Sequence, residues 1–73
     1  MNVYNCIFDF YEKPTTKELY PEINVTRDSF ELESENVPSD DVIKAEIQKR
    51  WAQNGKQNLI IDAILVPELA YTL

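Results

Sequence analysis

The side chains best suited to chemistry in this chain are carboxylates, since there are 13 Asp and Glu residues and no histidine. Histidine is the most common general base and the most common nitrogen ligand for metals. The single glycine, Gly55, cannot build a phosphate-binding loop, and the single cysteine, Cys6, cannot build a zinc site. The sequence therefore predicts a protein that is not an enzyme and that uses no metal or cofactor.

Two carboxylates, Asp9 and Asp62, lie within apolar sequence, where burial would raise a pKa and favour acid-base chemistry. An aspartate in such a strand more often meets a backbone donor, an arginine or a partner chain. We therefore do not expect either residue to be catalytic.

The acids are unevenly distributed along the chain. Residues 28 to 41 contain no lysine or arginine, and they contain six acids: Asp28, Glu31, Glu33, Glu35, Asp40 and Asp41. The remaining seven acids are balanced by seven basic residues, so this segment accounts for the whole net charge of −6. These six residues are the candidate site for binding a partner protein with a basic surface.

Within this segment Glu31, Glu33 and Glu35 alternate with other residues, as expected for one face of a strand. Carboxylates two residues apart on a strand are separated by roughly 6.8 Å, a spacing comparable in scale to that of charges along a nucleic-acid backbone. The alternative is that the glutamates keep an edge strand soluble. Asp40 and Asp41 have a further role, because acids stabilise the start of a helix.

Alternating apolar residues predict a first strand over residues 2 to 11, followed by a loop over residues 12 to 21 that contains Pro14 and Pro21. Residues 23 to 25 and 30 to 32 predict two short strands, with a turn at residues 27 to 29.

A helix is predicted over residues 40 to 54, capped by Ser39 and ended by Gly55, with Ile43, Ile47 and Trp51 on its apolar face. We expect this face to pack on a sheet that contains Phe8, Phe10, Ile61 and Leu65. Residues 58 to 66 are apolar on both alternating sets apart from one aspartate, which predicts a central strand. Residues 69 to 73 fit either a short edge strand or a docked tail.

These elements predict one α+β domain over residues 1 to 73, with the order β-β-β-α-β. The sheet is expected to be small, antiparallel or mixed, with three to five strands and one helix on one face. The N-terminal residues lack the features of a signal peptide, and the apolar runs are too short to cross a membrane, so we expect a cytoplasmic protein.

The basic residues Lys44, Lys49 and Arg50 follow the preference of a helix for positive charge near its end, and the net charge opposes direct nucleic-acid binding. We hypothesise a small acidic inhibitor, of the anti-CRISPR or anti-restriction type that phages and mobile elements encode. It would act as a DNA mimic that occupies a basic surface on a nucleic-acid-handling complex.

A second hypothesis is a structural or regulatory subunit that acts through homodimerisation or assembly. Large aromatic residues are enriched at protein interfaces, and the candidates here are Tyr11, Tyr20 and Tyr71.

Overall fold

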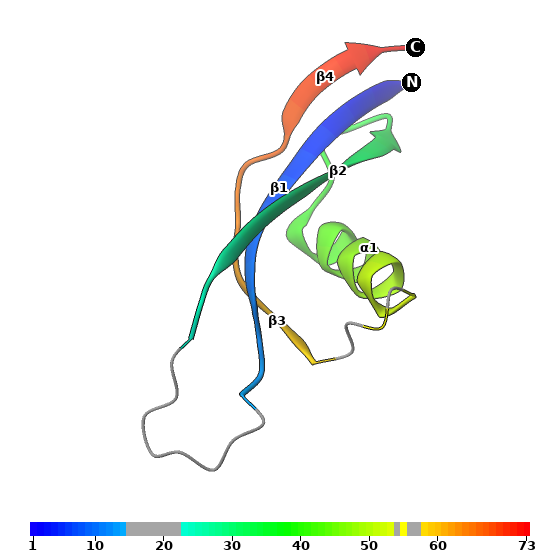
Figure 1. Ribbon diagram of the computed structural model, residues 1–73. Coiled ribbons are helices and arrows are strands. Elements are labelled where there is room, and N and C mark those ends of the chain that lie inside the picture. Colours follow the sequence, from blue (N-terminus) through cyan, green and yellow to red (C-terminus); the bar gives the residue numbers. More distant parts are fainter. Residues whose placement is uncertain (15–22, 54, 56–57) are drawn as a thin grey trace.

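The computed structural model describes residues 1–14, 23–53, 55 and 58–73, and these form one antiparallel sheet with a helix on one side (Figure 1). The elements are β1 (Asn2–Glu12), β2 (Thr26–Ser34), α1 (Asp40–Ala52), β3 (Leu59–Ile64) and β4 (Glu68–Thr72). The predicted α+β class is confirmed, and so is a small sheet with one helix. The element order among the described residues is β-β-α-β-β, which differs from the predicted β-β-β-α-β.

The long strand β1 is the centre of the sheet. Along one side it pairs with β2, from the pair Asn2 and Ser34 to the pair Phe10 and Thr26. Along the other side it pairs with β4 near its beginning and with β3 near its end. The prediction that residues 58 to 66 form the central strand is therefore wrong, because the 11-residue β1 is long enough to pair with two successive short strands.

Strand β2 replaces the two short strands and the turn predicted between residues 23 and 32. Residues 27 to 29 continue the strand, with Asp28 paired opposite Phe8, whereas residues 23 to 25 are exposed and lie outside any strand. A continuous ladder to β1 outweighs the turn preference of these residues. Of the predicted loop, Glu12 still belongs to β1, and residues 15 to 21 lie outside the described residues.

Helix α1 begins as the sequence predicts. The Ser39 hydroxyl accepts a hydrogen bond from the Val42 amide at 3.4 Å, and Asp40 and Asp41 occupy the first turn. The helix ends at Ala52, with Gln53 as its C-cap, so it is shorter than the predicted range of 40 to 54. Gly55 has a φ of +81°, the left-handed conformation that glycine adopts readily.

The core lies between α1 and one face of the sheet. Ile43 and Ile47 are completely buried against Phe8, and the Trp51 ring meets the Phe8 ring edge-on at 4.9 Å. Packing through Ile43, Ile47 and Trp51 is therefore confirmed, and among its predicted partners Phe8, Phe10 and Ile61 belong to the core or pack against it.

The fourth predicted partner of the helix, Leu65, lies beyond the end of β3, and Ile64 packs against the core in its place. An irregularity in the pairing of β1 with β3 shifts the register, so that Phe8 faces Ile64 and Phe10 faces Ile61. An inserted residue reverses the alternation of side chains that a regular strand would have.

Candidate protein-binding face

The sheet has a second face that α1 does not cover (Figure 1), and it is called the open face here. Because Tyr4, Cys6, Phe8 and Phe10 of β1 are buried on the helix side, the alternate residues of β1 lie on the open face. They are Val3, Asn5, Ile7, Asp9 and Tyr11. Residues directly opposite them on neighbouring strands share this face.

Strand β2 supplies most of the charge on the open face. Glu33 is opposite Val3, and Glu31 is opposite Asn5. Both glutamates are exposed, whereas Leu32 between them on the strand is partly buried and packs against the core. Two carboxylates spaced by roughly 6.8 Å therefore project from the same face into solvent.

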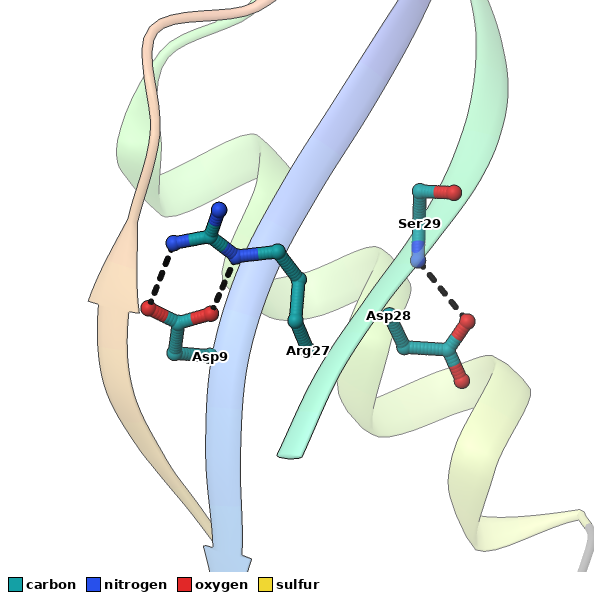
Figure 2. A network of polar contacts seen from close by, with 4 residues as sticks. All are labelled: Asp9, Arg27, Asp28 and Ser29. Atoms are coloured by element: carbon teal, nitrogen blue, oxygen red, sulfur yellow. Dashed lines mark hydrogen bonds and ion pairs between the residues drawn. The ribbon is translucent and has the colours of Figure 1, made fainter. Parts of the chain in front are cut away.

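The basic residue of β2 on this face, Arg27, is already paired. Its Nε lies 2.8 Å from Oδ1 of Asp9, and its Nη2 lies 3.2 Å from Oδ2 (Figure 2). The hydrogen bond from Arg27 is the main cause that holds the pKa of Asp9 below its usual value. This two-point contact neutralises the guanidinium, so Glu31 and Glu33 give the rest of β2 on this face a negative charge.

Tyr71 connects β4 to the acidic residues of β2 across β1. It is paired opposite Val3, and its hydroxyl donates a hydrogen bond to Oε2 of Glu31 at 3.2 Å. Val3 is only 3% exposed although α1 does not cover this face, which is consistent with the Tyr71 side chain lying across it. At this end of the open face, an apolar residue therefore lies buried close to the charged groups.

The negative charge on this face raises the pKa of Tyr71. The pKa is raised chiefly by the negative charge of Glu31, then by the hydrogen bond to Glu31, with smaller contributions from desolvation and from the charge of Glu33. Neither of the ion pairs among the described residues, Asp9 with Arg27 and Glu46 with Arg50, uses Glu31 or Glu33. The negative charges of Glu31 and Glu33 therefore remain available to an external cation.

The six acids of the candidate site do not all share one surface. Asp28 is opposite Phe8, so it lies on the helix side of β2 and not on the face of Glu31 and Glu33. Its Oδ1 accepts a hydrogen bond from the Ser29 amide at 2.8 Å (Figure 2). Glu35 follows the end of β2 at Ser34 and is exposed. Asp40 and Asp41 are exposed in the first turn of α1. Strand alternation separates Asp28 from Glu31 and Glu33, and Asp40 and Asp41 belong to the helix instead of β2.

Two of the three candidate interface tyrosines also lie on the open face. Tyr11 is partly buried and pairs opposite Ile60, and Tyr71 is 48% exposed. Tyr20 lies outside the described residues. Sequence reasoning missed Glu68, which is opposite Asn5 and adds another carboxylate to this face. It also missed the role of Arg27, since no local signal reveals the register that places Asp9 opposite it.

Other kinds of site have less support in the structure. Within residues 1–14, 23–53, 55 and 58–73, no group of three or more potential metal ligands comes together. Cys6 is fully buried, and burial is the main cause that raises the pKa of its thiol. In the part of the chain that the structure describes, no helix has the length and apolar character needed to cross a membrane.

Comparisons with other proteins do not add a family to this picture. No family model matches the chain, and searches of curated proteins and of solved structures give no significant match.

Proposed function

We propose that this protein is a non-enzymatic binding module whose open face occupies a basic surface on a partner protein. The observation that carries the proposal is the exposed pair Glu31 and Glu33 on a face where Arg27 is neutralised by Asp9. Such a face attracts a positively charged surface over several ångströms, which raises the association rate and orients the partner.

The partner surface we propose is one that normally holds nucleic acid. Carboxylates at strand spacing can meet lysine and arginine side chains that otherwise neutralise phosphates. The protein would then be a stoichiometric inhibitor, a DNA mimic of the anti-CRISPR or anti-restriction type, acting in the cytoplasm. The buried free thiol of Cys6 suits a reducing compartment.

A comparison of two matched variants tests this proposal. Glu31→Gln with Glu33→Gln removes two charges from the open face. Asp40→Asn with Asp41→Asn removes two charges from the same acidic segment but from the helix. Each variant and the parent would be used to capture proteins from a bacterial lysate, and duplex DNA would be added to release what was bound.

We expect the parent and the helix variant to retain basic nucleic-acid-binding proteins that duplex DNA displaces. The open-face variant should lose them. Equal recovery with all three chains would contradict a role for the open face, and loss with the helix variant alone would place the binding surface at the start of α1.

A further inference from the structure

The two outer edges of the sheet differ in how strongly they resist pairing with another strand. An edge strand carries unpaired backbone donors and acceptors, and charged side chains or blocked amides prevent it from joining another sheet. Among the described residues, β2 pairs only with β1 on one side, and β4 pairs only with β1 on the other.

The edge formed by β2 is protected. The Ile7 carbonyl accepts a hydrogen bond from the Leu65 amide at 3.0 Å, so the backbone polar groups of Ile7 point away from β2. Ile7 and the opposite residue Ser29 are therefore a pair without hydrogen bonds between them, and the Ser29 amide points to the outer edge of β2. There the amide is occupied by the carboxylate of Asp28. A second copy pairing along this edge would also bring together the like charges of Glu31 and Glu33.

The edge formed by β4 has little protection. Its only charged residue is Glu68, and its side chains leave apolar surface in solvent: Leu69 is 58% exposed, and Leu73, just beyond the strand, is 67% exposed. The Leu73 amide points inward to the Met1 carbonyl at 2.8 Å, so the neighbouring Thr72 amide points outward. Leu69, opposite Tyr4, lies on the helix side of the sheet and not on the open face.

We propose that β4 pairs in an antiparallel manner with β4 of a second copy of this chain. An antiparallel edge is complementary to itself, because a twofold axis perpendicular to the sheet brings the donors of each copy to the acceptors of the other. The apolar side chains of β4 are then buried by their counterparts. Five residues make a short contact, so the dimer forms reversibly and its population depends on concentration.

This pairing joins the two sheets with both open faces on the same side. Six strands then lie side by side, in the order β2-β1-β4 of one copy followed by β4-β1-β2 of the other. The two β2 strands, which carry Glu31 and Glu33, are five steps of about 4.8 Å apart, or about 24 Å. The pairing itself does not depend on the acidic residues or on the proposed inhibitor function.

Sedimentation of the full chain at rising concentration tests the pairing. The parent should approach twice its monomer mass, and Leu69→Lys should associate at least about tenfold more weakly, because a charge at this edge must be desolvated or repelled. Val42→Lys is the matched control, since Val42 is 48% exposed on α1, away from β4. It should dimerise like the parent, and so should the chain with Glu31→Gln and Glu33→Gln.

Hydrogen exchange on the parent chain gives an independent measurement if Leu69→Lys folds poorly. Amides of residues 68 to 73 should gain protection at high concentration, while those of β2 should not. A parent that stays monomeric throughout, protection in β2 in place of β4, or a folded Leu69→Lys chain that dimerises as well as the parent would each overturn the proposal. If the parent dimerises as expected but its open face captures no partner, the edge pairing stands and the proposed inhibitor function falls.

Discussion

Asp9 and Arg27 show how a single contact sets the charge of the open face. Asp9 lies in β1 and Arg27 in β2, and the register of these two strands places them opposite each other. The Asp9 side chain is 18% exposed and that of Arg27 is 62% exposed, so the carboxylate is partly shielded while the guanidinium closes over it from solvent. Without this contact, the positive charge of Arg27 would offset the negative charge of one of the glutamates that we propose as binding residues.

The pH dependence of stability should reveal this pair. Because the folded-state pKa of Asp9 is lowered, its ionised form stabilises the fold above the usual aspartate pKa of about 3.9. That stabilisation is lost as the pH falls through the lower folded-state pKa. Asp9→Asn should therefore reduce the loss of melting temperature between neutral and acidic pH, by a modest amount because Arg27 is largely exposed.

Arg27→Gln is the matched variant for this pH series, since it removes the partner and leaves the carboxyl in place. It should weaken the acid dependence in the same direction as Asp9→Asn. If both variants lose as much melting temperature as the parent on acidification, the contact does not stabilise the protein in solution.

At the scale of elements, α1 and its contact with β1 hold the fold together. Ile43 and Ile47 are fully buried, and the rings of Phe8, Phe30 and Trp51 meet at edge-on or tilted angles that favour aromatic contacts. The Arg50 guanidinium lies 4.7 Å from the centre of the Phe30 ring and covers the margin of this cluster.

Ile47→Ala should therefore lower the free energy of unfolding by about 2–5 kcal/mol, from lost burial and the cavity left behind. Domains of this size seldom exceed about 5 kcal/mol, so much of the variant should be unfolded. Chemical denaturation followed by circular dichroism measures this change.

Val42→Ala provides the control for the helix, because Val42 is 48% exposed on the same element. Its effect should stay within about 0.5 kcal/mol. Equal effects of the two alanine substitutions would mean that the helix does not pack through the face that contains Ile47.

At the scale of the whole molecule, the protein is elongated. Its principal extents are 48 × 21 × 16 Å, and its radius of gyration is 14.1 Å, compared with about 11 Å for a compact chain of this length. A helix of 13 residues covers only one face of a sheet built around an 11-residue strand. The helix therefore leaves the open face and the β4 edge uncovered.

The salt dependence of partner binding tests the electrostatic role of the open face. Removing both charges with Glu31→Gln and Glu33→Gln should weaken binding to the captured partner at least about tenfold, equivalent to about 1.4 kcal/mol. The variant should also show a flatter dependence on salt, because exposed charges are screened beyond about 8 Å at physiological ionic strength. Titration calorimetry at several salt concentrations measures both effects, and the melting temperature checks that the fold is intact.

If the Glu31→Gln and Glu33→Gln variant kept the affinity and the salt dependence of the parent, these two glutamates would serve only to keep the protein soluble. Tyr11 and Tyr71 on the same face would then be the next residues to replace.

Local sequence patterns determined the start of the helix and its buried face, because the Ser39 cap and the spacing of Ile43, Ile47 and Trp51 act within a few residues of each other. The alternation around Glu31 likewise placed that residue and Glu33 on one side of a strand. Pairing between distant segments decided the rest. The hydrogen-bond ladder to β1 kept residues 27 to 29 in a strand. Register shifts cannot be read from an alternating sequence pattern. They put Ile64 in the core instead of Leu65, and they placed Tyr71 opposite Val3 and beside Glu31.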